Sequence, residues 1–596
     1  MKRTPKRSIL AFLALNFPLL CLPLLCWPAL CSAGLFLSSE WPLPGPQIQS
    51  SPPAAENDVN FDPVFIPQSF EEEDPLTDLD DLDGLQTDVK KISLSLNGKD
   101  PMVAAGRNFV VVSTSQEVSF RDKEGAPLAT KNGVFSTIAT QTMFAEFLDR
   151  ESANDINKHT GFILPCDSPV YPNTTLNKFC VGRVLDTRVY FDALGNRFII
   201  LAEAKNVIRT DLWRPEEYPD KFSGSKNGFE WCGVYENART GKDSALPSTS
   251  YCALARRHQF FAISKTEDPR DGFYTYAIKK QNYVDFPWGS VNAEGDMFTI
   301  GAANPGTKYG AVATVIRLSD LRNGNPEPRY FQLSRADLIA AHPNTVDTST
   351  SPYKNNLYNP APIVQHGSGA GLQGHTLLLS PLNRWKPGYN PDVIPGMTDK
   401  LRVFGFGSPQ GQGIKPVVHY AESVMPDPFL PSFPMHTVYR NGNLHMAWQV
   451  TETVRPKRKQ LRYIRVPISV TSTPGNVIKF QSVFSTGYSY WVTSFLDKTN
   501  LFPALAVNAN EELIVPYRRG GGAEIRLIRW HPDWSSPATN GTLMHLADVT
   551  WKERDIDYSW AVVDPADDQT FWFAQRAQIT DNYSQFHLYR VGALLQ

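Results

Sequence analysis

Four aspartates at the ends of predicted strands are the residues best suited to chemistry in this sequence. They are Asp186, Asp285, Asp557 and Asp564. If the fold brings two or three of them together in a funnel, one carboxyl group can act as an acid and another as a base or nucleophile, the arrangement that cleaves glycosidic bonds. An aspartate beside a tight turn can instead accept local backbone N–H bonds and hold the turn. Both roles stay open for each of the four.

A second group of candidates lies in the long segment 201–260. Its aromatic rings could stack on sugars and its cations could hold anions; the candidate ligand-binding residues are Arg209, Trp213, Trp231 and Tyr235. An earlier segment, 148–181, is also long, and long loops without strong secondary-structure signals are often functional. We expect the two segments to pack as one cap, which either recognises a ligand or only shields a face of the protein.

The cysteines outside the N-terminal segment number four, and each of the two long segments contains two of them: Cys166 and Cys180, then Cys232 and Cys252. Four cysteines allow three disulfide connectivities. We expect Cys166–Cys180 and Cys232–Cys252, because these pairs close the shortest loops, and each such bridge stabilises by about 3 kcal/mol in the chain-entropy model. The alternative is four free buried thiols.

Two histidines flank the sharpest turn signal in the chain. Asn441-Gly442 predicts a two-residue type I′ hairpin, which places His436 opposite Ala447 and His445 opposite Val438. Both imidazoles then share one face of the hairpin, where they could join a metal or be buried as neutral groups. No third ligand is identifiable, and CxxC, HExxH and GxSxG motifs are absent. We therefore predict no metal and no cofactor.

The N-terminus has the pattern of a targeting segment. A basic start, MKRTPKRS, precedes an apolar stretch at 9–30, and Cys31-Ser32-Ala33 offers small residues for cleavage. We expect 1–33 to be a signal peptide, with an uncleaved membrane anchor as the alternative. Residues 34–92 are rich in proline and end in an acidic run, which predicts a disordered tether. The rest of the chain should be secreted, periplasmic or at the cell surface.

The remaining chain, 93–596, repeats one local pattern. Composition favours many short strands, with 12% aromatic residues, 39 glycines and 47 prolines, and a formal net charge of −2 gives no basic field for nucleic acid. A turn of Gly, Asn or Asp leads into an apolar strand in seven units, at 102–114, 189–204, 291–302, 369–381, 438–450, 506–517 and 562–574. Seven units without domain linkers predict an all-β fold, a single β-propeller of about seven blades.

Several of these stretches resemble those of exported bacterial β-propeller proteins of unsettled activity. The resemblance is carried by LDTRVYFDALGNRFIILAEA (185–204), AISKTEDPRDGFYTYAI (262–278) and DYSWAVVDPADDQTFWF (557–573). It covers most of the chain after residue 92, departs in the segment 201–260, and is loose near His366–His375. It implies the fold and little about chemistry.

Two functions remain compatible with these patterns. The first is a non-catalytic exported propeller that binds a protein or a surface glycan outside the cytoplasm, with membrane contact only through an uncleaved N-terminal segment. The alternative is a carbohydrate-active hydrolase or lyase that uses carboxylates in the propeller funnel. Two or more carboxylates gathered at one polar funnel would favour the enzyme.

Overall fold

The computed structural model describes most of residues 89–593, all within one compact unit, Ile48–Gln596. The gaps are 132–133, 145–178, 210–228, 234–250, 255–257, 280–284, 293, 304–310, 326–327, 335–336, 338–360, 368–371, 373, 382–399, 407–417, 425–435, 452–458, 471–477, 480–488, 496–500, 520–523, 532–541, 547–558 and 581–582. The predicted signal peptide, nearly all of the predicted tether, Cys166, Trp213, Tyr235 and Asp557 lie outside the described residues. Among the residues that are described, no helix is long and apolar enough to cross a membrane.

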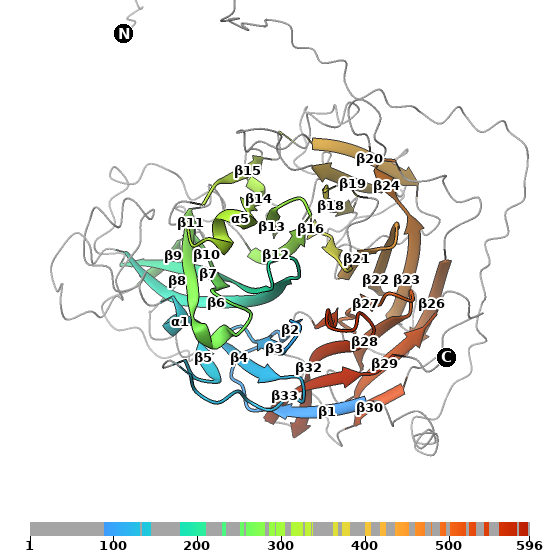
Figure 1. Cartoon of the computed structure of the whole chain (residues 1–596), viewed down its shortest axis with the longest axis horizontal. Helices are drawn as coiled ribbons and strands as arrows, with labels where there is room; N and C mark the ends of the chain where they lie inside the picture. The colour runs from blue at the N-terminus through green and yellow to red at the C-terminus, as the bar shows by residue number, and fades with distance from the viewer. Residues whose placement is uncertain are drawn as a thin grey trace, which may run out of the picture. The chain divides into compact units, whose positions relative to one another are not determined.

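The described strands form seven sheets of four to six strands, arranged around a centre as the blades of a propeller (Figure 1). Blade 1 contains β2 (Met102–Ala105), β3 (Phe109–Ser113), β4 (Glu117–Asp122) and β5 (Thr137–Ala139). Blade 2 contains β6 (Phe179–Asp192), β7 (Arg197–Arg209), β8 (Phe229–Gly233), β9 (Tyr251–Leu254), β10 (His258–Ser264) and β11 (Phe273–Lys279). Blade 3 contains β12 (Asp285–Asn292), β13 (Met297–Ala303), β14 (Ala311–Arg317) and β15 (Tyr330–Ser334). The predicted all-β propeller is confirmed.

Blades 4 to 7 complete the ring. Blade 4 contains β16 (Ala361–Pro362), β18 (Thr376–Pro381), β19 (Lys400–Phe406) and β20 (Val418–Val424), and blade 5 contains β17 (Val364–Gln365), β21 (His436–Arg440), β22 (Asn443–Thr451), β23 (Lys459–Pro467) and β26 (Ser489–Phe495). Blade 6 contains β27 (Ala506–Val507), β28 (Leu513–Arg519), β29 (Glu524–Trp530) and β30 (Thr542–Leu546). Blade 7 contains β31 (Trp560–Val563), β32 (Phe571–Thr580), β33 (Tyr583–Val591) and β1 (Val89–Leu94). A small extra sheet pairs β24 (Ser469–Val470) with β25 (Ile478–Lys479), and the short helices are α1 (Thr140–Met143), η4 (Pro269–Asp271) and α5 (Leu318–Arg322).

The innermost strands contact one another in a closed circuit, β2 to β6, β12, β17, β21, β27, β31 and back to β2. The seven sequence units correspond to the inner hairpins that these strands begin. Blade 4 is the least regular, because its first strand is divided between β16, which pairs with β18, and β17, which runs parallel to β21 of blade 5. This irregularity explains the loose match near His366.

The ring is closed by the N-terminal strand. β1 pairs antiparallel with β33, from Val89 opposite Val591 to Leu94 opposite Phe586. Blade 7 therefore combines three C-terminal strands with one strand from the other end of the described chain. Because β1 starts at Val89, the ring begins a few residues before residue 93.

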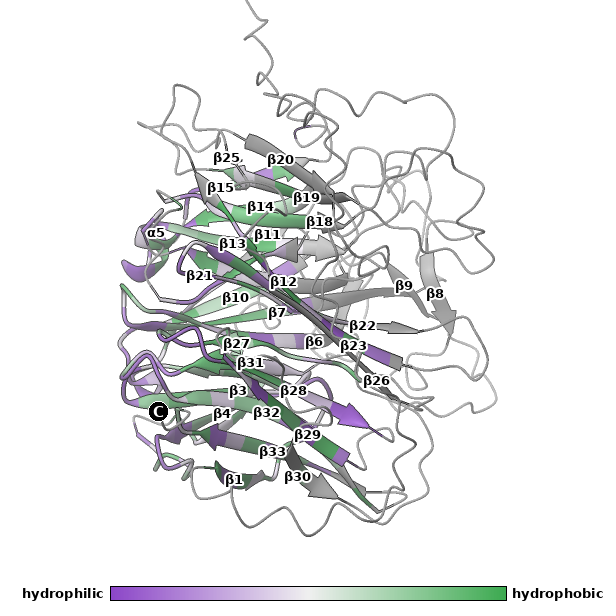
Figure 2. Ribbon diagram, turned by 90° about the vertical axis from the view of Figure 1, so that its right-hand side faces the viewer, coloured by the Kyte–Doolittle hydropathy of each residue, from purple (hydrophilic) through white to green (hydrophobic). Residues whose placement is uncertain are grey.

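The turns that join the two innermost strands of each blade gather at one end of the ring, here called the turn end (Figure 2). In four of them the first residue caps the turn with its side chain: Gly195 donates its N–H to Asp192 at 3.0 Å, and Ala566 donates to Asp564 at 2.9 Å. Asn292 and Asn508 act in the same way. The opposite end, where the innermost strands begin, is called the mouth end.

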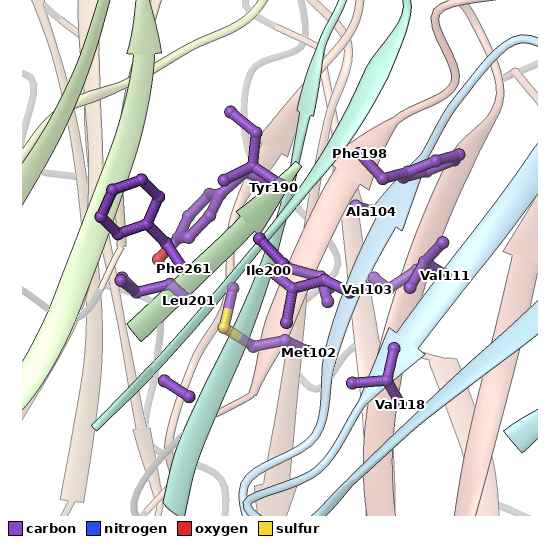
Figure 3. Close-up of a cluster of buried hydrophobic side chains, with 14 of the residues drawn as sticks. Met102, Val103, Ala104, Val111, Val118, Tyr190, Phe198, Ile200, Leu201 and Phe261 are labelled. Carbon is purple, nitrogen blue, oxygen red and sulfur yellow. The ribbon is translucent and has the colours of Figure 1, made fainter. Parts of the chain in front are cut away.

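Side chains packed between neighbouring blades form the core. Figure 3 shows this packing between blades 1 and 2, where Met102 and Val111 meet Ile200, Leu201 and Phe261. All five are fully buried. Each buried side chain of this size contributes roughly 1.5–3 kcal/mol, so the blades are held together mainly by these apolar faces.

Candidate functional site

Unusual backbone conformations mark the mouth end. Eight described non-glycine residues have a positive φ, and five of them occupy tight turns: Asn196, Asp296, Asn441, Glu511 and Asp568. The other three lie at the mouth end, where no hairpin turn requires the left-handed region: Asp100 (φ 53°), Asp186 (φ 56°) and Phe502 (φ 43°). Such residues are uncommon, and clusters of them point to functional sites.

Asp186 owes its position to a bulge in β6. The register between β6 and β7 shifts at this point, because Leu185 lies opposite Glu203 whereas Arg188 lies opposite Leu201. Blade 1 fixes the bulge, because Ser113 Oγ donates to Thr187 O at 3.2 Å and Thr187 Oγ1 lies 2.8 Å from Thr140 Oγ1. A bulge of this kind redirects the side chains around it.

Arg188, just after the bulge, is the centre of a charged cluster. Its side chain is fully buried and its guanidinium lies 5.4 Å from the ring of Trp288. Burial lowers the pKa of Arg188, and the nearby Tyr190, Asp100, Asp186 and Glu203 oppose that effect. Three carboxyl groups from blades 1 and 2 therefore act on one guanidinium.

A second buried arginine, Arg518, is also influenced by Asp100. Arg518 on β28 is 4% exposed, and its guanidinium lies 5.7 Å from the ring of Phe502. The pKa of Arg518 is lowered to about 10, mainly by burial and also by Arg576, while Asp100 opposes the lowering. Ser559 Oγ donates to Phe502 O at 2.5 Å, which links blades 6 and 7 at this point. The charged cluster thus draws on blades 6, 7, 1 and 2.

Aromatic side chains from four innermost strands contact one another across the ring. Trp560 lies 5.5 Å from Trp288, 6.1 Å from Tyr190 and 4.0 Å from His436, measured between ring centroids. These residues come from blades 7, 3, 2 and 5, and none is more than 6% exposed. Gly289 donates its N–H to the Tyr190 hydroxyl at 2.6 Å, and burial raises the pKa of Tyr190, so this phenol stays protonated.

Of the four predicted funnel carboxylates, the structure describes the side chains of two, and these two lie at opposite ends of the ring. Asp186 belongs to the cluster at the mouth end. Asp564 lies at the turn end, where it accepts bonds from Lys123 Nζ at 2.6 Å and Trp572 Nε1 at 2.9 Å and ties blade 7 to blade 1. Asp285 is the first residue of β12, opposite Ala303, and nothing about its side chain is described. Asp100 and Glu203, which were not among the four, act together with Asp186 on the guanidinium of Arg188.

The hairpin around Asn441-Gly442 has the predicted register. His436 lies opposite Ala447 and Val438 opposite His445, and both turn residues have a positive φ. His436 Nδ1 lies 3.0 Å from Leu505 O, and burial lowers the pKa of both histidines to about 3. Among the described residues no group of three His, Cys, Asp or Glu side chains could hold a metal ion.

Of the predicted cap residues, the structure places two by their backbone. Arg209 ends β7 opposite Tyr251, and Trp231 lies on β8 opposite Ala253. Trp213 and Tyr235 fall in the gaps. Whether these residues bind a ligand stays a prediction.

Sequence reasoning missed Asp100, Arg188, Glu203 and Arg518. A signal for the first of them is present, because Asp100 directly precedes a proline at the start of an innermost strand. A similar X-Pro step occurs before two other innermost strands, at Phe433-Pro434 and Phe502-Pro503, and within the first residues of β12, at Phe286-Pro287. Proline is tolerated at the start of a strand, where its missing N–H is not needed. Arg188, Glu203 and Arg518 lie inside strands and carry no comparable signal.

No family model matches the chain, and no curated protein matches it. Among solved structures it is similar to a protein of unknown function from Dyadobacter fermentans, at 8% identity and a TM-score of 0.29 over 85% of this chain and 100% of the other. It is also similar to an ulvan lyase from a new polysaccharide lyase family, at 11% identity and a TM-score of 0.36 over 84% and 96%. An α-L-arabinofuranosidase from Lactobacillus brevis matches at 10% identity and a TM-score of 0.22, over 51% and 89%. At these identities and TM-scores the likenesses carry no inference about chemistry.

Proposed function

We propose that this protein is an exported carbohydrate-active enzyme that cleaves a glycan at the mouth end of its propeller. The observation that carries the proposal is that Asp100, Asp186 and Glu203 all act on the buried guanidinium of Arg188, next to the bulge at the mouth end. Export rests on the N-terminal targeting pattern.

The burial of the three carboxyl groups divides their roles. Glu203 is fully buried and Asp100 is 5% exposed, whereas Asp186 is half-buried. Glu203 therefore serves as an internal counter-charge to Arg188. Asp186, the most accessible, contacts the scissile bond, and Asp100 is the second carboxyl group of the pair. In glycoside cleavage one such group donates a proton to the leaving oxygen and the other acts as base or nucleophile.

The test is a panel of neutral and acidic polysaccharides incubated with the parent protein and with Asp186→Asn. New reducing ends report any cleavage, and ultraviolet absorbance of an unsaturated product identifies a lyase. We expect the parent to cleave at least one glycan and Asp186→Asn to lose at least about 100-fold in rate, since a positioned acid or base contributes 10²–10⁴-fold.

The matched control is Glu124→Gln, which removes a carboxylate paired with Lys90 on the surface and should leave the rate unchanged. A parent protein that binds a glycan without cleaving it would overturn the enzyme proposal in favour of a non-catalytic binding protein. An Asp186→Asn variant that cleaves at the parent rate would remove Asp186 from the chemistry.

A further inference from the structure

Among the described strands, those of blade 2 form an extension beyond the four strands of an ordinary blade. Its first two strands, β6 with 14 residues and β7 with 13, are the longest described strands. β10 pairs with β7 only over Ile199–Ala204, as expected for a blade. Beyond that point β7 pairs with β9 over Val207–Arg209, and β9 pairs with β8. We call this four-stranded part, which comprises 179–185, 205–209, β9 and β8, the arm.

The pairing within the arm brings two cysteines together. Cys232 on β8 lies directly opposite Cys252 on β9 in an antiparallel pair. Residues at such positions share one face of the sheet and have Cα atoms about 4.5–5.5 Å apart. A disulfide needs about 4.4–6.8 Å. We propose that Cys232 and Cys252 form a cross-strand disulfide that holds the arm together.

The same strand order excludes the competing connectivities. Cys180 lies on β6 opposite Val207, and β7 separates β6 from β9. With strands about 4.8 Å apart, Cys180 is two strands, or about 10 Å, from Cys252 and about 14 Å from Cys232. Both separations exceed the reach of a disulfide, whose limit is about 7 Å. Only the connectivity that joins Cys232 to Cys252 fits the sheet, which leaves Cys166 as the partner of Cys180.

The bond forms by exchange with a disulfide oxidant of the export compartment. The two thiols lose two protons and two electrons as the S–S bond forms, and the oxidant's disulfide is reduced to two thiols. Among the described strands of blade 2, β8 is the outer strand of the arm and pairs with β9 alone. The bridge therefore ties the least supported strand to its neighbour, and reduction should loosen the arm without opening the ring.

The arm also adjoins the proposed site. Leu185, its last residue on β6, pairs with Glu203 and directly precedes Asp186. If the proposed function holds, the arm forms one wall beside the reacting carboxylates, and its order should affect how a glycan is held. The inference that the arm borders the site rests on the proposed function, whereas the disulfide between Cys232 and Cys252 does not.

Peptide mapping of the full chain, recovered from the exported fraction without reduction, tests the bridge. We expect a peptide pair that joins Cys232 to Cys252 and no pair that joins either of them to Cys180. Two alkylatable thiols at Cys232 and Cys252, or a link to Cys180, would overturn the proposal. The mapping uses the parent protein, so it is decisive even if a variant fails to fold, and its result is independent of any cleavage activity.

Hydrogen exchange on a variant with Cys232→Ser and Cys252→Ser tests the mechanical role. Amides of 229–233 and 251–254 should exchange at least tenfold faster than in the parent, while those of β31 to β33 stay unchanged. Equal exchange in β8 and β9 would show that the bridge does not hold the arm. If the parent cleaves a glycan and the variant has the same KM, the arm is not a wall of the site, although the bridge would stand.

Discussion

Three buried histidines make the stability of this propeller depend on pH. His366, His436 and His445 lie between blades 5 and 6, and each is at most 8% exposed. Burial, with smaller contributions from neighbouring groups such as Arg440 and Arg465, lowers the pKa of each from 6.5 to about 3. The folded state thus holds neutral imidazoles that the unfolded chain protonates below about pH 6.5.

The direction and size of the effect follow from these values. Because the folded pKa is depressed, the full stability is present above pH 6.5 and is lost as the pH falls toward 3. At pH 5 the unfolded pKa lies about 1.5 units above the pH, which corresponds to about 2 kcal/mol for each histidine. The three together amount to about 6 kcal/mol, a large share of the roughly 5–15 kcal/mol that holds a typical domain folded.

Urea unfolding followed by tryptophan fluorescence at pH 7, 6 and 5 measures this loss. The informative comparison is between the parent and His436→Asn, because the substitution removes one titrating group and the carboxylates common to both proteins cancel. We expect the parent to lose about 2 kcal/mol more than the variant between pH 7 and pH 5. His531→Asn, outside the blade 5–6 interface, is the matched control. Equal losses in the parent and His436→Asn would refute the reasoning.

Three further predictions concern the ring itself. A chain that lacks Val89–Leu94 should melt at a lower temperature by calorimetry, because blade 7 loses its outer strand; an unchanged midpoint would contradict closure by β1. Arg322→Gln should cost about 3 kcal/mol in urea, since it leaves the buried Asp192 carboxylate without its cation, whereas the more exposed pair of Arg329 should cost less than about 1 kcal/mol in Arg329→Gln. Gly442→Ala should cost about 1 kcal/mol, because φ is +77° there although an added Cβ meets no atom within 4 Å; a neutral result would contradict the turn type.

The blades could be predicted from the sequence because the residues of their turns follow a recognisable pattern. An Asp or Asn that caps its own turn, followed by an apolar strand, is a local pattern, so the inner hairpins could be found without knowing what they pack against. The register of the hairpin at Asn441-Gly442 was predictable for the same reason, since a two-residue turn fixes which residues face each other. Seven such hairpins were enough to predict the propeller.

The site was less predictable because identical local patterns have different positions in the ring. Asp186 and Asp564 are both aspartates beside strands of similar composition, yet one lies at the mouth end and the other caps a turn at the opposite end. Only the direction of the strand decides between them. The cluster also depends on Asp100 and Arg518, which are more than 400 residues apart in the chain and are brought together by ring closure.

The sequence by itself therefore determined the all-β character, the number of inner hairpins and the turns that reverse them, because these depend on residues a few positions apart. The tertiary structure decided which carboxylates share a guanidinium, which histidines lose their charge and which cysteines face each other across β8 and β9. Those outcomes depend on contacts between distant strands and on burial, and both arise only when β1 joins β33 and the ring closes around its aromatic centre.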